Sequence, residues 1–288
     1  MENNTEKVKQ ASINDLINIM NKANDTFAYS IFVPSLEKNV MFREINTAQQ
    51  KKLVKSIVDS PIFNTEFIFT LREIIKENCT ESDININNLT IFDKMLISLN
   101  MRIYSVGNDL VVTAKCPTCE KQHSVKIDLT TLLETAKKEI SFNTTEVITD
   151  ETNTFKVVCK IPTIETEYNL ENEMRKNTKI DVKTEVELRE TLGNVFIGEV
   201  VKFIDKIEIT DKVLDKVIEL DLHAMKFTDR IKIIERLNVK VLKKVIDYIT
   251  TIKKEFDKIL LLKMNCDCAD KTEITQRFSI DSNFFIIS

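Results

Sequence analysis

The chain has 288 residues, 43% of them hydrophobic and 30% charged, and a formal net charge of −4. This length can bury a sizeable core as one large domain or two smaller ones. The mild acidity argues against extended binding to a phosphate backbone. Three glycines in all, none in a glycine-rich loop, argue against P-loop and dinucleotide-binding enzymes. No stretch approaches the roughly 20 apolar residues of a membrane-spanning helix, and the polar N-terminus does not resemble a secretory signal, so we expect synthesis in the cytoplasm.

Residues 1–26 are predicted to form a polar N-terminal arm. Within this arm, Ile13, Leu16, Ile17 and Met20 fall at helical spacing. We therefore expect one short amphipathic helix, which docks either on this chain or on a neighbouring protein.

Residues 27–109 are predicted to form an α+β module. Alternating apolar residues on both sides of "PSLEKN" indicate two strands joined by a turn. The stretch "NTAQQKKLVKSIVDS" predicts a helix with Thr47 as its N-cap. Two more helical patterns follow, in "NTEFIFTLREIIKENC" and "TIFDKMLISLNMRIYSV".

The hydrophobic pattern changes from helical to alternating after Gly107. In "DLVVTAKCPTCEKQHSVKIDL" a β-rich run lies on each side of a cysteine pair, which predicts a hairpin with Cys116 and Cys119 at its tip. A short helix, "DLTTLLETAKKEI", is expected to follow. Near the C-terminus, "LLLKMNCDCADKTEITQRFSI" repeats the strand–turn–strand arrangement with Cys266 and Cys268 in the turn.

The intervening residues 136–259 are predicted to be an inserted, mainly helical module. They contain a second hairpin in "EVITDETNTFKVVCKIPTI" and a strongly charged stretch, 167–189, which we interpret as a solvated helix or an extended excursion. The clearest amphipathic pattern lies in "TDRIKIIERLNVKVLKKVIDYITTIKKEFDKILLL". The predicted fold class is therefore α+β, in which residues 110–135 together with 260–288 form a zinc-ribbon-like pair of hairpins that closes around the insertion.

The two cysteine pairs, C-P-T-C and C-D-C, together offer four thiolates. Zinc favours four tetrahedral ligands, and a closed set of four cysteines is typical of a structural site. We therefore predict a structural Zn²⁺ bound by Cys116, Cys119, Cys266 and Cys268. Such an ion would join two distant hairpins, and it predicts about one zinc per chain and loss of folded protein on chelation.

Three alternatives to this ligand set remain open. His123 could replace one cysteine of the second pair, or support a ligand from outside the first coordination shell. A redox C-x-x-C of thioredoxin type would need the pair at a helix N-terminus after a strand. A structural disulfide does not suit a reducing compartment. Cys79 and Cys159 stand alone and are expected to be small buried hydrophobic residues.

Catalytic constellations are scarce in the sequence. The chain has two histidines, His123 and His223, and no serine in a nucleophile-elbow pattern. A closed four-thiolate zinc site keeps no open position for a catalytic water. We therefore predict that the protein is not an enzyme.

The stretch "FVPSLEKNVMFREINTAQQKKLVKSIV" resembles the start of the baseplate hub subunits of T4-like contractile-tailed bacteriophages. "FTDRIKIIERLNVKVLKKVIDYI" and the closing "DSNFFIIS" are also similar to that family. The resemblance implies a non-catalytic structural or assembly component of the virion tail baseplate. Its expected neighbours are other hub, spike or tape-measure proteins, and a homo-oligomer is also possible. The zinc prediction depends on the cysteines of this sequence and is independent of the resemblance.

Two other functions compete with a baseplate role. A zinc-ribbon nucleic-acid-binding regulator should cluster basic residues around its cysteines, whereas here Lys115, Lys121, Lys126 and Lys263 are accompanied by Glu120, Asp267 and Asp270. This mixed charge makes nucleic acid an unexpected partner. A thiol-disulfide oxidoreductase is the second alternative.

Overall fold

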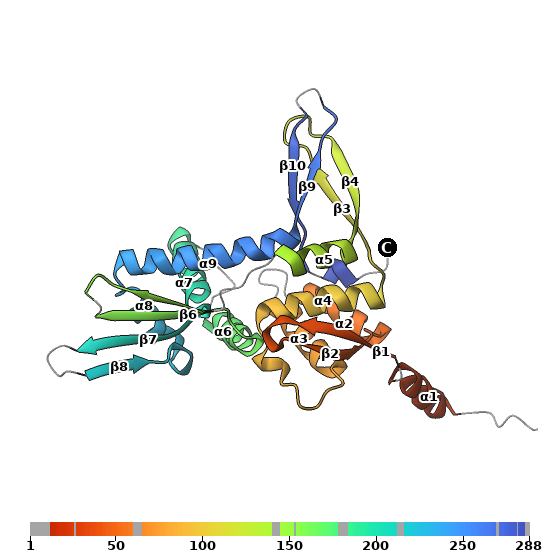
Figure 1. Cartoon of the computed structure of the whole chain (residues 1–288), viewed down its shortest axis with the longest axis horizontal. Helices are drawn as coiled ribbons and strands as arrows, with labels where there is room; N and C mark the ends of the chain where they lie inside the picture. The colour runs from red at the N-terminus through yellow and green to blue at the C-terminus, as the bar shows by residue number, and fades with distance from the viewer. Residues whose placement is uncertain are drawn as a thin grey trace, which may run out of the picture.

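The computed structural model describes residues 12–25, 27–59, 65–139, 145–152, 154–177, 184–211, 216–268, 271–280 and 282–285. Helices and small antiparallel sheets confirm the α+β class. Two bodies lie side by side, and four strands project from them as a narrow arm (Figure 1). The helix α1 (Ile13–Asp25) lies apart, beside the first body.

The first body contains one hairpin and three helices, as the sequence predicts. These elements are β1 (Ala28–Val33), β2 (Lys38–Arg43), α2 (Thr47–Asp59), α3 (Thr65–Asn78) and α4 (Ile91–Ser105), with short 3-10 turns at Pro34–Leu36 (η1) and Ile86–Asn88 (η2). Thr47 is the first residue of α2 and not its N-cap, so that prediction is wrong. Asn46 is the cap instead, because its side chain accepts the N–H of Gln49 at 2.9 Å while the Gln49 side chain accepts the N–H of Asn46 at 3.2 Å.

The second body is built on a four-stranded antiparallel sheet of order β5-β6-β7-β8. Its strands are β5 (Thr145–Thr149), β6 (Phe155–Lys160), β7 (Ile204–Asp211) and β8 (Lys216–Leu220). Its helices are α6 (Ile164–Asn177), α7 (Glu185–Lys202), α8 (Phe227–Ile234) and α9 (Val239–Leu260), with a 3-10 turn at Leu222–Ala224 (η3). The segment predicted to be a mainly helical insertion thus also carries a sheet, because "VFIGEVVKFIDKIEI" changes from helix to strand at Ile204.

Within the charged stretch 167–189, residues 167–177 belong to α6 and residues 185–189 to α7, while residues 178–183 lie outside the described residues. The described parts follow the helical alternative of the two interpretations, but α6 is not simply solvated. Glu167 and Glu171 are buried and form ion pairs with Lys94 of α4 and Lys202 of α7. The helix therefore joins the two bodies through buried charges in addition to apolar contacts.

Two separate apolar cores support the bodies. The first contains Ile31, Phe42, Leu71 and Leu99, and it extends to Leu260, Phe278 and Phe285 from the C-terminal part of the chain. The second contains the inner face of the four-stranded sheet and the apolar side of α9, including Val157, Ile207, Val245 and Ile249. The stripe predicted on "VLKKVIDYI" therefore packs within the chain.

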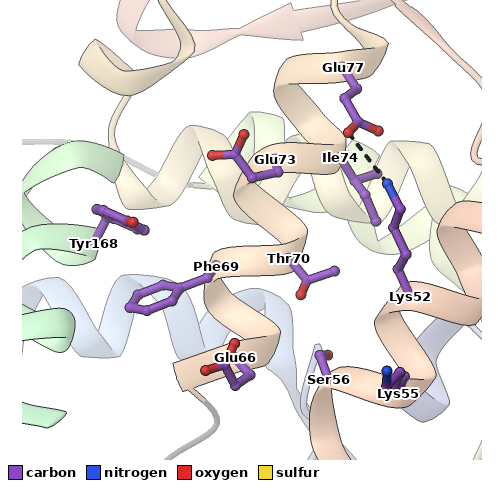
Figure 2. Close-up of a pocket in the computed structure, with 10 residues that line it drawn as sticks. All are labelled: Lys52, Lys55, Ser56, Glu66, Phe69, Thr70, Glu73, Ile74, Glu77 and Tyr168. Carbon is purple, nitrogen blue, oxygen red and sulfur yellow. Dashed lines mark ion pairs between the residues drawn. The ribbon is translucent and has the colours of Figure 1, made fainter. Parts of the chain in front are cut away.

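A cavity of about 500 Å³ lies between α2, α3 and α6 (Figure 2). Phe69 and Tyr168 meet there with ring centroids 4.5 Å apart, and the Arg72 guanidinium lies 4.0 Å from the Tyr168 ring. Lys52 and Glu77 form an ion pair of 3.6 Å beside it. The described residues that line the cavity include neither histidine nor cysteine, so they offer no thiolate or imidazole chemistry.

Candidate metal centre

The projecting arm consists of two antiparallel hairpins, as predicted. The first is β3 (Asp109–Lys115) with β4 (Gln122–Asp128), followed by α5 (Leu129–Glu139); the second is β9 (Leu261–Asn265) with β10 (Glu273–Arg277), followed by a 3-10 turn at Ser282–Phe285 (η4). The hairpins face each other although more than 130 residues separate them in sequence (Figure 1).

The two cysteine-bearing turns have similar backbone geometry. In the first, the N–H of Cys116 donates to the carbonyl of Lys121 at 2.9 Å, and in the second the N–H of Cys266 donates to the carbonyl of Thr272 at 2.9 Å. Each turn also contains a residue with positive φ, Glu120 at 60° and Lys271 at 44°. Few non-glycine residues adopt that region, so a left-handed residue is a second feature that the two turns share.

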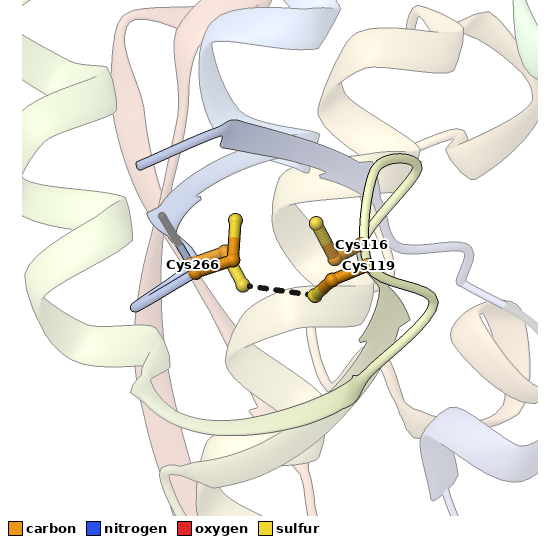
Figure 3. Close-up of side chains that lie close together, drawn as sticks. Cys116, Cys119 and Cys266 are labelled. Atoms are coloured by element: carbon orange, nitrogen blue, oxygen red, sulfur yellow. Dashed lines mark hydrogen bonds between the residues drawn. The ribbon is translucent and has the colours of Figure 1, made fainter. Parts of the chain in front are cut away.

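The four cysteines of the two turns converge. The Sγ atoms of Cys116, Cys119, Cys266 and Cys268 all lie within 4.8 Å of one another. Figure 3 shows Cys116 and Cys119 on one turn pointing toward Cys266 on the other, with 3.5 Å between the sulfurs of Cys119 and Cys266. Cys116 and Cys266 are buried, whereas Cys119 is exposed.

Polar contacts between the two turns surround the sulfurs. The hydroxyls of Thr118 and Thr272 lie 2.9 Å apart, and the Lys121 ammonium donates to both carboxylate oxygens of Asp267 at 3.0 Å. The sequence gives no signal for the threonine pair, because that contact depends on how two distant hairpins align.

The side chain of His123 lies next to the cysteine cluster. Its Nε2 atom is 3.2 Å from the Cys266 Sγ. A second set of potential ligands, His123, Cys266 and Asp267, also lies within 4.8 Å. The histidine is therefore placed either to donate a hydrogen bond to a thiolate ligand or to compete with a cysteine for a metal.

The surroundings shift the pKa values of two of the thiols in opposite directions. Backbone N–H groups of Cys119 and Thr118 hydrogen-bond to the Cys116 sulfur and lower the pKa of that thiol. Burial raises the pKa of the Cys266 thiol to about 12. A buried thiol of this kind loses its proton when a cation compensates the charge, because metal ligation requires the thiolate.

The geometry fits a zinc ion. Four sulfurs at about 2.3 Å from a tetrahedral centre lie about 3.8 Å from one another, which is close to the spacing of this cluster. Four thiolates also match the ligand set of closed structural sites. The C-P-T-C pair lies on a hairpin turn and not at a helix N-terminus, so it lacks the geometry of a thioredoxin-type redox pair.

The two remaining cysteines lie elsewhere. Cys159 is buried in β6, and burial raises the pKa of its thiol to about 12. Cys79 is half-buried next to the first core, and its Sγ lies 3.7 Å from the carbonyl of Glu81. Neither belongs to the cysteine cluster. Cys159 is buried as predicted, whereas Cys79 is only partly buried.

Comparison with known proteins identifies the family. A family model described as "T4 bacteriophage base plate protein" matches residues 26–285, a range that begins directly after α1 and ends with the last residue of η4. No curated protein and no solved structure is detectably similar to the chain. In the part of the chain that the structure describes, no helix is long and apolar enough to cross a membrane. Because the family match covers nearly the whole chain, the protein belongs to the family of T4 bacteriophage base plate proteins.

Proposed function

We propose that the protein is a non-catalytic structural component of the phage baseplate, that it works at the baseplate hub, and that it carries a structural zinc ion. The family match over residues 26–285 supports the baseplate role. The resemblance of "FVPSLEKNVMFREINTAQQKKLVKSIV" to hub subunits supports the finer assignment. The neighbours expected there are hub, spike or tape-measure proteins, and the protein would be made in the host cytoplasm and carried into the virion tail.

The zinc proposal is supported by the convergence of four thiols from two distant hairpins. The apolar core at the arm's tip is small, with Ala114, Cys116, Cys266 and Ile274 as its buried members. So small a core cannot hold two hairpins together firmly, because apolar burial scales with the area removed from water. A structural zinc contributes of order 10 kcal/mol in small zinc-binding peptides, which would fix the tip.

The charge around the arm supports a protein neighbour over a nucleic acid. Four lysines of the arm have acidic partners; the pairs are Lys115–Glu120, Lys121–Asp267, Lys126–Asp109 and Lys263–Glu273. Nucleic-acid binding depends on an excess of positive charge on one face. We therefore expect no salt-sensitive gel shift with DNA or RNA.

The baseplate role is tested by locating the protein in purified phage. Mass spectrometry of intact virions and of isolated baseplates should detect the chain in both, and loss of its gene should give tails that lack an assembled hub. Detection in infected cells but in neither particle would contradict a structural role and favour an assembly factor.

The metal is tested on the purified chain. Elemental analysis should find about one zinc per chain, and Co²⁺ substitution should produce the absorption bands of tetrahedral thiolate coordination. Cys266→Ser should abolish both signals, whereas Cys79→Ser, the matched change outside the cluster, should leave them intact. Failure of the folded chain to bind either zinc or Co²⁺ when the metal is supplied would refute the zinc site.

A further inference from the structure

The first residue of the N-terminal helix α1 is defined by a cap at Ser12. Ser12 and Asp15 make a reciprocal cap: the Asp15 N–H donates to the Ser12 hydroxyl at 3.2 Å, and the Ser12 N–H donates to the Asp15 carboxylate at 3.1 Å. The Ser12 hydroxyl also donates to this carboxylate at 2.7 Å. These bonds satisfy donors that a helix start otherwise leaves unpaired.

The apolar side of α1 is uncovered. Its large apolar side chains are between 48% and 76% exposed; they are Ile13, Leu16, Ile17, Ile19 and Met20. Every side chain of α1 that the structure describes is exposed, and the helix stands off the first body (Figure 1). The sequence left two docking sites open for this helix, this chain or a neighbouring protein. In the structure α1 does not pack on the described surface of its own chain.

A helix of this kind needs a partner to persist. Isolated helices shorter than about 12–15 residues are marginal in water, and α1 has 13 residues. We propose that α1 docks into an apolar groove on a different protein of the baseplate, as a helix-in-groove anchor. This inference rests on the proposed baseplate function.

A second copy of this chain is a poor occupant for the helix. Self-pairing coiled coils sustain three or four heptads, and α1 spans fewer than two. Each of its five apolar side chains can bury about 100 Å², and the total of about 500 Å² is below the roughly 800 Å² per partner of a stable interface. The helix therefore suits a multi-protein assembly, in which other contacts add to its own.

The sequence of α1 also indicates the chemistry of the groove. The polar side includes Asn14 and Asn18, with Asp15 and Lys22 as described charged residues. Such a surface has little net charge and would gain little from electrostatic steering. The complementary groove should be apolar along its floor and should carry few charges at its rim.

The first test places a photo-crosslinking amino acid in the full-length chain within infected cells. At Ile17, on the apolar side, we expect one discrete crosslink in purified tails, to a different baseplate protein. At Asn18, on the polar side, we expect at least a tenfold weaker product. A crosslink from Ile17 to a second copy of this chain, or equal products from both positions, would overturn the proposal.

The second test replaces the apolar side chains and leaves the rest of the fold intact. Leu16→Asn with Ile17→Asn should lower incorporation into tails at least tenfold, while the purified variant keeps the zinc content and circular dichroism of the wild type. Asn14→Ala on the polar side is the matched control and should incorporate normally. Normal incorporation of the double variant refutes the docking role, whereas absence of the wild-type chain from tails refutes the baseplate function itself.

Discussion

His123 is placed for two different roles at the cysteine cluster, hydrogen bonding to a ligand or direct ligation, and a substitution can separate them. Its Nε2 atom lies 3.2 Å from the Cys266 sulfur, and the four cysteine sulfurs lie within 4.8 Å of one another. Residues that support metal ligands typically contribute 10–100-fold in affinity. We therefore expect His123→Ala to weaken zinc binding by about 10–100-fold without changing the stoichiometry, as measured by competition with a chelating dye.

The same measurement of zinc affinity distinguishes a His123 that hydrogen-bonds to a ligand from a His123 that binds the zinc itself. His223 lies in η3, among residues of the second body, so His223→Ala is the control and should leave zinc affinity unchanged. If His123 instead replaced Cys268 as a ligand, Cys268→Ser would retain tight binding and His123→Ala would abolish it.

Lys202 is the most strongly buried cation of α7. Its ammonium lies 2.9 Å from Glu171 and 2.6 Å from Glu199, and its side chain is 8% exposed. Burial opposes its charge, but the two carboxylates outweigh that effect and raise the pKa of Lys202. Removing one partner of a buried ion pair typically costs about 3–5 kcal/mol, and we expect a loss of that size in the unfolding free energy of Lys202→Met at pH 7.

The pH dependence of the Lys202→Met variant follows from the carboxylates left behind. Burial raises the pKa of Glu199, and the ammonium groups of Lys202 and, to a smaller extent, Lys253 outweigh burial and lower it. A lowered folded-state pKa stabilises the fold above the unfolded-state pKa, and this contribution is lost as the pH falls through the folded value. Without Lys202 the half-buried Glu199 carboxylate binds its proton more readily in the folded state, so the stability deficit of the variant should shrink as the pH falls from 7 toward 4.5, the ordinary pKa of a glutamate.

A matched control for Lys202 is an ion pair on the surface. Lys240 and Glu151 lie 2.7 Å apart with both side chains more than 70% exposed. Exposed pairs contribute about 0–1 kcal/mol, so Lys240→Met should change the unfolding free energy little at any pH. Equal losses in the two variants would mean that Lys202 acts through packing alone.

At the scale of elements, two helices begin with the same device in different surroundings. The cap of α4 is Thr90, whose hydroxyl accepts the N–H of Asp93 at 3.1 Å, and the fully buried Asp93 also accepts the N–H of Ser35 at 3.1 Å. The cap of α7 is Thr184, which is exposed. We expect Thr90→Ala to cost about 1–2 kcal/mol and Thr184→Ala about 0.5–1 kcal/mol in urea unfolding. If Thr184→Ala lost more unfolding free energy than Thr90→Ala, burial would not determine how much a cap stabilises its helix.

The elements differ in how well the sequence predicts them. The hairpins and the amphipathic helix α9 follow from the period of their apolar residues, and the structure places them as expected. The helix α6 carries no comparable stripe, because two of its buried positions are Glu167 and Glu171. Their partners Lys94 and Lys202 lie 73 and 31 residues away in sequence. Local patterns cannot reveal a buried charge whose partner is that distant.

At the scale of the whole molecule, the candidate metal centre was partly predictable. Closely spaced cysteines in two hairpins indicate the four ligand candidates, since a tetrahedral site needs four donors. The position of His123 and the Thr118–Thr272 contact depend on the relative alignment of the hairpins. The sequence also did not predict how the base of the arm is attached to the first body. Its base contributes Val112, Ile127 and Phe278 to the first core, independently of the cysteines.

This anchoring leads to a specific expectation for zinc removal. The length of the insertion alone suggests that chelation would unfold the chain, but the segments that enter and leave the arm are already held by the first core. Leu260 and Phe278 are joined there by a backbone hydrogen bond of 3.0 Å. Chelation should therefore open the tip and leave both bodies folded.

Hydrogen exchange on the intact chain measures this outcome directly. After chelation, the amides of Cys116 and Cys266, which bond across their turns, should lose protection, whereas the paired amides of β6 and β7 should keep theirs. Cys116→Ser, which lacks a complete ligand set, should show the open tip at the start and no further change with chelator. Loss of protection throughout the second core would instead mean that the metal stabilises the whole chain, because local opening of the arm leaves that core's contacts intact.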